Sequence, residues 1–396
     1  RSLEHTAACW HLMHEPKRLP PSVAERLHAL YRTSHTAAKP VLLWALARAA
    51  IERKELLNAP GEDAAWTQAF CTLLWEAERF GVLSIQAGAR PAHIGKSDFS
   101  LTAYAIANPG TRLVGGNPPI QSPALAAEAT ALAARYIRSL VDNFRGLDAD
   151  GADLYKQPEF PWRGYFSADH VLAAIHDRFS KKRGAGFYGW PFAKLVVLAW
   201  EDRLRGKRGS PDRQPWERFH WSDSVEHIYP QTPDPIWGES ICIKGRNKDQ
   251  VAASIAGSLG NLLMLSGSYN SELSNRPFRC VDGKDKASRY AHGSYSEQQI
   301  VQLCERWTIV EIAARGIAML LHAQTHWGFQ LVRENADVSE WLPYLFGPLA
   351  ERVGRGDFYK GVRLDGRNVG KLVERFNQPL VEASAGRVGN GRVRRS

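Results

Sequence analysis

The chain has 396 residues, enough for two or three domains that each bury a core of their own. Its 51 lysines and arginines outnumber its 41 aspartates and glutamates, and the formal net charge of +10 is compatible with a nucleic-acid partner without requiring one. No run of about 18 uncharged apolar residues and no long low-complexity tract occurs, which argues against a membrane-spanning protein and against a disordered one.

The first residue and the cysteines indicate what kind of protein and compartment to expect. Arg1 stands where an initiator methionine is expected and no signal peptide follows, so we expect a piece of a longer cytoplasmic protein. The cysteines are scattered and form no Cys-x-x-Cys pair, which predicts buried free thiols in a reducing compartment rather than a zinc site. They are Cys9, Cys71, Cys242, Cys280 and Cys304.

The first part of the chain is predicted to be helical. Apolar periodicity indicates helices at residues 23–31, 41–57, 64–80 and 123–144. Glycine, proline and asparagine interrupt residues 81–117, which predicts a loop or a short hairpin. Residues 146–164 predict a second, solvated loop, because their aspartates lack the glycine and the closing glutamate of a calcium loop.

Two further helices are predicted at residues 167–179, with Ser167 as the N-cap, and 192–205. Basic clusters at 181–183 and 203–208 flank Tyr188, Trp190 and Trp200. Such interleaving can hold a phosphate backbone and stack on bases. The alternative is a pair of solvated helix ends with aromatic residues in the core, and the sequence slightly favours it.

The end of the chain follows a different pattern. Residues 296–326 predict one long amphipathic helix or two, and 342–373 are mixed. From Gly354 onward ten basic residues stand against four acidic ones, and the glycine- and arginine-rich residues 387–396 predict disorder. This tail either holds DNA or is a plain solvated terminus. We expect a helical domain at 1–209, a second domain at 210–340, and a basic end at 341–396.

The residues that carry chemistry lie between Ser224 and Phe278. The first motif, Val-Glu-His-Ile-Tyr-Pro-Gln, places Glu226 and His227 ahead of a proline. The second, Leu-Gly-Asn-Leu-Leu-Met-Leu, contains Asn261, and Asn270 follows nine positions later. Cleaving a phosphodiester requires an activated water and a cation that neutralises the developing charge. These two motifs therefore predict a metal-dependent phosphodiesterase.

Each of these residues has a predicted role. His227 can take a proton from water, because the ordinary pKa of histidine lies near neutrality. Glu226 and the Asn270 amide oxygen suffice for Mg²⁺, which keeps several waters, with Mn²⁺ as the alternative. Asn261 is then free to orient His227 and fix its tautomer. Glu226 and His227 can serve one site only where their strand bends or ends.

The two motifs, with Asn275 and the Pro-Phe pair at 277–278, resemble the HNH (His-Me finger, ββα-metal) endonucleases. More narrowly, they resemble the C-terminal nuclease domain of GmrSD-type restriction proteins, which include the phosphorothioate-sensing Ssp defence effector. Trp307, Ile312 and Arg315 fit the helix that follows in that family. The resemblance covers residues 192–327, and nothing before about residue 165 contributes to it. Two departures are the glutamate at 226, where many HNH enzymes have aspartate, and the long insertion after Gln231.

The resemblance implies a mainly α fold that contains a ββα-metal domain with a few short strands. It implies Glu226 and Asn270 on the metal, His227 as the general base, and Asn261 in support. Further supporting or DNA-contact candidates are Asn275, Arg276, Lys284 and Arg315. The insertion leaves Asp234 or Glu239 open as alternative ligands.

The function that we expect is cleavage of double-stranded DNA in bacterial defence against phage or modified DNA, by nicking as the natural activity of a monomer or by double-strand scission. The family's N-terminal sensor or NTPase domain is expected to be missing from this piece. Two alternatives remain open: a DNA-binding scaffold with a decayed site, and an RNase or toxin with the same centre. His322 and His326 have the i, i+4 spacing of metal ligands but lack the zincin glutamate, so we expect them to pack in the core.

Overall fold

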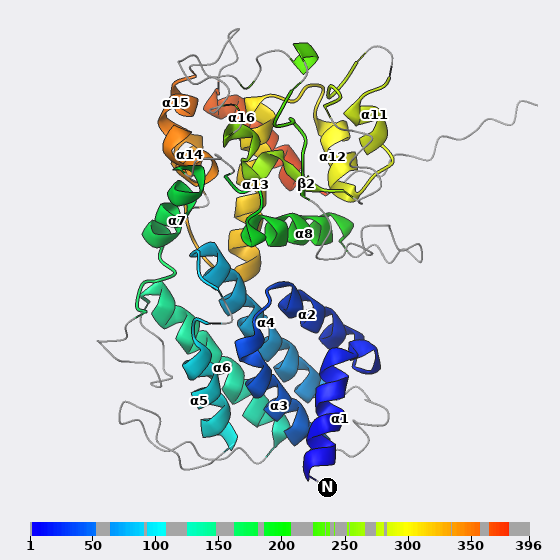
Figure 1. Cartoon of the computed structure of the whole chain (residues 1–396), viewed down its shortest axis with the longest axis vertical. Coiled ribbons are helices and arrows are strands. Elements are labelled where there is room, and N and C mark those ends of the chain that lie inside the picture. Colours follow the sequence, from blue (N-terminus) through cyan, green and yellow to red (C-terminus); the bar gives the residue numbers. More distant parts are fainter. Residues whose placement is uncertain are drawn as a thin grey trace, which may run out of the picture.

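The computed structural model describes most of the chain. The described residues are 2–52, 64–90, 93–107, 125–147, 162–180, 186–206, 225–233, 235–237, 241, 252, 254–265, 275–280, 283–333, 335–356 and 364–379. The fold is mainly α, with one small two-stranded antiparallel sheet, as the sequence predicts. The helices up to α6 form the lower half of Figure 1, and the described helices and strands from α7 onward form the upper half.

The lower half is a helical bundle. Its central pair is α4 and α6, with α2 packed against α4, while α3 contacts α1, α5 and α6. The bounds are α1 (Ser2–His14), η1 (Pro16–Arg18), α2 (Pro21–Arg32), η2 (Thr36–Ala38), α3 (Lys39–Glu52), α4 (Ala64–Gln86), α5 (Lys96–Ala107) and α6 (Ala126–Arg145). The four predicted helices are thus present with shifted ends, and the predicted end of the second one at 57 lies outside the described residues.

The predicted loop at 81–117 is wrong in its first half. α4 runs through Gly81 to Gln86, and α5 occupies residues that the sequence assigns to the loop. Gly81 serves packing rather than helix termination, because a Cβ there would lie 2.7 Å from the Thr33 hydroxyl. The glycine lets α4 approach the turn that follows α2.

His35 lies inside this bundle and gives it a pH dependence. Its Nδ1 is 2.9 Å from the Ala77 carbonyl oxygen, and its ring stacks on Phe80. Burial lowers the pKa of His35 to about 4 from 6.5. The unfolded state therefore takes up a proton as the pH falls through 6.5, and the folded state does so only near pH 4. This contribution to stability is full above pH 6.5 and declines down to pH 4.

We expect His35→Phe to weaken the loss of stability in acid. Between pH 7 and pH 5 the free energy of unfolding of the wild type should fall by about 2 kcal/mol more than that of the variant. Chemical denaturation at the two pH values measures both losses. Equal losses in the two proteins would show that His35 is not buried in its neutral form.

The upper half surrounds the small sheet. Its elements are α7 (Ala168–Ser180), α8 (Pro191–Arg205), β1 (Val225–His227), η6 (Pro235–Trp237), η7 (Leu259–Asn261), β2 (Leu262–Met264), α11 (Lys286–Tyr290), α12 (Tyr295–Leu303), α13 (Ile309–Trp327), α14 (Val338–Phe346), η8 (Gly347–Leu349), α15 (Ala350–Arg355) and α16 (Gly366–Asn377). The predicted helix at 167–179 is confirmed, and the Ser167 hydroxyl accepts a hydrogen bond from the His170 amide (3.3 Å). Residues 296–326 form two helices, each opened by its own capping box at Ser294 and Thr308.

α13 is the centre of the upper half. It packs against η7, α8, α14 and α16, and α8 also packs against β2. Gly260 and Gly316 allow the closest of these approaches, since a Cβ on Gly260 would lie 1.9 Å from the Ile312 carbonyl oxygen. The Leu-Gly-Asn motif therefore requires its glycine for contact between two backbones.

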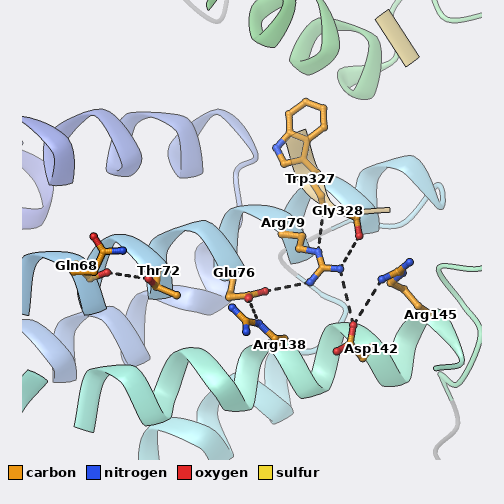
Figure 2. Close-up of polar contacts among 9 residues, drawn as sticks. All are labelled: Gln68, Thr72, Glu76, Arg79, Arg138, Asp142, Arg145, Trp327 and Gly328. Atoms are coloured by element: carbon orange, nitrogen blue, oxygen red, sulfur yellow. Dashed lines mark hydrogen bonds and ion pairs between the residues drawn. The ribbon is translucent and has the colours of Figure 1, made fainter. Parts of the chain in front are cut away.

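The two halves meet at the C-terminal end of α13 (Figure 2). Arg79 of α4 donates from Nε to the Trp327 carbonyl oxygen and from Nη2 to the Gly328 carbonyl oxygen, both at 2.8 Å. Its guanidinium also pairs with Glu76 (3.4 Å). The last carbonyls of a helix lack partners within the helix and carry its negative end, so a buried arginine is well placed to cap them.

Other predictions have mixed outcomes. Arg203 stacks on the buried Trp200 and donates to the Asn377 carbonyl oxygen (2.6 Å), which supports the core alternative for that cluster. Residues 181–183, 207–208 and 387–396 and the boundary at Gly209 lie outside the described residues, and the domain division stays a prediction. No helix in the described ranges has the length and apolar character to cross a membrane.

Four of the five cysteines are described, and all four are free thiols. Cys9 and Cys304 are buried, as predicted, whereas Cys71 and Cys280 are only half-buried. Cys242 lies outside the described ranges.

Candidate functional site

The site is built on the short strand pair. β1 and β2 are antiparallel, with Glu226 opposite Leu263 and His227 opposite Leu262. β2 is buried along its whole length, and η7 immediately before it is anchored on α13. The apolar Leu-Leu-Met segment thus fixes β2 in the core, and β1 is held through its pairing with β2.

Glu226 and His227 lie where β1 ends. Adjacent strand residues point to opposite faces, yet here the Glu226 carboxylate turns back and accepts a hydrogen bond from the His227 amide (3.0 Å). Glu226 is half-buried and His227 is buried. The predicted end of the strand at this point is confirmed, and it allows both side chains to serve one site.

The His227 imidazole is shielded from solvent and electrostatically unusual. The Tyr188 ring lies over it, with a centroid distance of 4.3 Å. Nε2 is buried and has no hydrogen-bond partner in the described part of the chain. Burial and the nearby Lys286 ammonium lower the pKa of His227 to about 4 from 6.5. The imidazole is therefore neutral at pH 7, with a nitrogen available to accept a proton.

Lys286 is the principal site residue that sequence reasoning missed. It is the first residue of α11 and is buried, and its Nζ donates to the His227 carbonyl oxygen at 3.0 Å. Burial lowers the pKa of Lys286 to about 8, while the Glu226 carboxylate acts in the opposite direction. Asp285 is the N-cap of this helix and accepts a hydrogen bond from the Ser288 amide (2.7 Å). An aspartate is a common helix-start residue, so the start of α11 can be recognised from the sequence. Only the fold places the next residue against His227.

Asn261 supports the site in a different way from the one predicted. Its amide nitrogen donates to the carbonyl oxygens of Tyr229 (2.9 Å) and Ala256 (2.8 Å). Its amide oxygen accepts from the Tyr229 amide (2.8 Å) and from Trp307 Nε1 (2.9 Å). These four bonds use the donors and acceptors of the amide, and none of them goes to the imidazole. Asn261 therefore holds the backbone that follows His227, not its ring.

We expect Asn261→Ala to destabilise the protein by about 3 kcal/mol, because it leaves buried partners without hydrogen bonds. Asn275→Ala is the matched control: Asn275 is exposed, and its backbone carbonyl, not its side chain, accepts from Trp237 Nε1. Asn275→Ala should change the free energy of unfolding by no more than about 0.5 kcal/mol. Denaturant unfolding of both variants tests the difference, and an equal stability of the two would contradict it.

Arg315 also supports the strand pair. It is fully buried in α13, and its Nη1 donates to the carbonyl oxygens of Gly260 (2.8 Å) and Leu262 (2.7 Å). Burial lowers the pKa of Arg315 to about 10, opposed by the buried Glu201 carboxylate. Two roles were considered for Arg315, support of the site and contact with DNA. Because the side chain is fully buried, it fits support of the strand pair and is not accessible to DNA.

The remaining candidates lie around this centre. Asn275, Arg276 and Lys284 are exposed. Asn270, Asp234 and Glu239 lie outside the described residues, so their roles stay predictions. Within the described ranges no group of three or more histidine, cysteine, aspartate or glutamate residues is placed to hold a metal.

The histidine pair on α13 packs as predicted. His322 Nε2 lies 3.2 Å from the Ala199 carbonyl oxygen, and its ring meets Trp200 edge to face. His326 packs edge to face on Trp327. The i, i+4 spacing on this helix therefore serves packing against α8 and the adjoining core.

An antiparallel strand pair followed by a helix, with Glu-His at the end of the first strand, defines a small ββα nuclease region within a mainly helical fold. Residues 177–321 match the family of GmrSD restriction endonucleases, C-terminal domain. The matched segment runs from the end of α7 into α13 and contains Glu226, His227, Asn261, Lys286 and Arg315. This match supports a GmrSD-type nuclease C-terminal part within these residues, and nuclease activity in general. No curated protein and no solved structure matches the chain.

Proposed function

We propose that the protein is a metal-dependent DNA endonuclease of the HNH type that acts in restriction defence. The observation that carries the proposal is the buried Nε2 of His227, which has no hydrogen-bond partner among the described residues, in a histidine whose backbone amide is bonded to the Glu226 carboxylate at the end of β1. A buried polar atom without a partner is costly, and such atoms are retained where they serve a function. This one lies inside the segment that matches a nuclease family.

His227 is the general base in this mechanism. Its neutral ring takes a proton from the attacking water, and the negative charge of a bound phosphate raises its pKa towards a more useful value. Nε2 is shielded from solvent, so water and DNA reach it only after the surrounding side chains move. Asn261 keeps the backbone after His227 in place during this movement.

The residues at the end of β1 fit a divalent metal. Glu226 supplies a half-buried carboxylate, and Mg²⁺ needs only one or two protein ligands. Glu226 and Asn270 would hold the ion, which supplies charge stabilisation for the scissile phosphate. Lys286 adds a fixed positive charge beside the pair that favours the approach of a phosphate.

A single centre of this kind cuts one strand in each event, so nicking of double-stranded DNA is the natural activity of a monomer. We place the protein in the cytoplasm, where foreign DNA arrives. We also propose that the nuclease works together with a sensor domain that selects the DNA to be cut.

Supercoiled plasmid with Mg²⁺ or Mn²⁺ tests the metal site. We expect open-circular product first, no product with a chelator, and a rate about 100-fold lower for Glu226→Gln. Glu305→Gln, at an exposed carboxylate after α12, is the matched control and should cleave like the wild type. Cleavage of structured RNA but not plasmid would favour the RNase alternative, and cleavage of neither would favour the scaffold.

A further inference from the structure

A cavity of about 310 Å³ lies where the helical bundle meets the nuclease part, apart from the site at β1. Its walls come from the turn after α2, the end of α4, α7 and the start of α8. Its volume lies at the lower end of the range for small-ligand pockets. It is therefore large enough for a small molecule or for one group of a larger ligand.

The charged residues of the described wall are all basic. Arg32, Arg90 and Arg178 line the cavity, and no carboxylate among the described residues does. Arg32 is bonded to Asp202 (3.3 Å), a carboxylate that also pairs with Arg205 (3.5 Å). Arg90 is exposed and has no ion pair with any residue in the described ranges. The described residues of the cavity thus carry an excess of positive charge, of which the Asp202 carboxylate neutralises only a part.

The wall is also rigid and presents the positive end of a helix. Trp190 Nε1 donates to the Ile85 carbonyl oxygen (3.1 Å), which ties the start of α8 to the end of α4. The Arg178 guanidinium lies 5.2 Å from the centroid of the same indole ring. α8 begins at Pro191 in the wall and is 15 residues long, so its dipole favours an anion there.

We propose that this cavity binds a phosphate group. Guanidinium groups match phosphate oxygens bidentately, and three of them around one cavity, of which Arg32 is paired with Asp202, favour a polyanionic group over a neutral ligand. The phosphate comes from one of two sources, a small phosphorylated molecule or the backbone of bound DNA.

The site is connected to the candidate catalytic centre by one short turn. Trp190 lines the cavity, and two residues earlier Tyr188 lies over the His227 ring. The turn is anchored at its start, where the Phe187 amide donates to the Gly257 carbonyl oxygen (2.9 Å). A ligand held against the start of α8 therefore lies two residues along the chain from the side chain that covers His227.

Two binding measurements in a chelator test the proposal without any cleavage. Calorimetry measures binding of inorganic pyrophosphate, and fluorescence anisotropy measures binding of a short labelled DNA duplex. Arg90→Gln and Arg178→Gln should each raise the dissociation constant of the probe that binds in the cavity, pyrophosphate or DNA, about 10-fold. Arg135→Gln, at an exposed position on α6, is the control and should change it by less than about twofold.

The outcomes separate the two sources. Weaker pyrophosphate binding with unchanged DNA binding assigns the cavity to a small phosphorylated molecule. Weaker DNA binding, together with competition by pyrophosphate, assigns it to the DNA backbone. If neither Arg90→Gln nor Arg178→Gln differs from Arg135→Gln, or if the wild type binds neither probe, the proposal is overturned. Because no step requires catalysis, a wild type that binds but does not cleave would count against the proposed function alone.

Discussion

Replacing His227 by alanine is expected to lower the rate of plasmid cleavage by about 100- to 10,000-fold, the range that a general base contributes. The reason is the position of its Nε2, which is buried and has no hydrogen-bond partner among the residues that the structure describes, in a ring that is neutral at pH 7. The substitution should leave DNA binding in a chelator nearly unchanged, because the ring is shielded from solvent. Initial rates of nicking with saturating metal measure the effect.

Two control variants distinguish loss of catalysis from loss of folding and from a nonspecific effect of replacing a histidine. His227→Gln keeps most of the side-chain volume, so a variant with a melting temperature near the wild type but no activity separates catalysis from folding. His292→Ala, at an exposed histidine after α11, should cleave like the wild type. An active His227→Ala protein alongside an inactive Glu226→Gln protein would show that another group acts as the base.

Replacing Gly260 by alanine is expected to destabilise the protein by at least about 3 kcal/mol. The added Cβ would lie 1.9 Å from the Ile312 carbonyl oxygen and 2.7 Å from the Gly316 amide nitrogen. Both contacts are backbone atoms of α13, so relief requires the helix to move away from η7. That movement would also break the bonds from Arg315 to the strand pair.

Gly370→Ala is the matched control for this prediction. Gly370 lies within α16, and a Cβ there would meet nothing within 4 Å. Alanine is the better helix former, so this variant should gain about 0.5–1 kcal/mol. The melting temperatures of the two variants should thus shift in opposite directions from that of the wild type, down for Gly260→Ala and up for Gly370→Ala. A Gly260→Ala protein as stable as Gly370→Ala would show that η7 and α13 are farther apart than described.

The interface between the halves shows why the helical first part resisted interpretation from sequence. The sequence offers Arg79 as one charged residue on an amphipathic helix. The fold brings it to the last carbonyls of α13, a sequence separation of 248 residues for the bond to Trp327 (Figure 2). No periodicity or short motif reports a contact of that range, because such patterns record only neighbours along the chain.

Much of the architecture is encoded locally. Short windows of sequence indicate α2, α3, α4 and α6 and the N-cap at Ser167. The capping boxes at Ser294 and Thr308, which divide residues 296–326 into two helices, are also local features. The helix of residues 64–86 is an instructive failure, since Gly81 reads as a break in sequence but fits a close contact in space. Glycine has two uses, and only the neighbouring element decides between them.

The sequence by itself determined the chemistry of the candidate site: a carboxylate beside a histidine at a strand end, with a glycine-asparagine motif to follow, and this was enough to indicate a nuclease of the GmrSD type. Only the tertiary structure decided how those groups are arranged. It directs Asn261 to the backbone after His227, buries Lys286 against the same residue across 59 positions, and covers the imidazole with Tyr188. The physical reason is that residue type fixes which bonds a side chain can make, whereas its burial, its pKa and its actual partners depend on segments that meet only after folding.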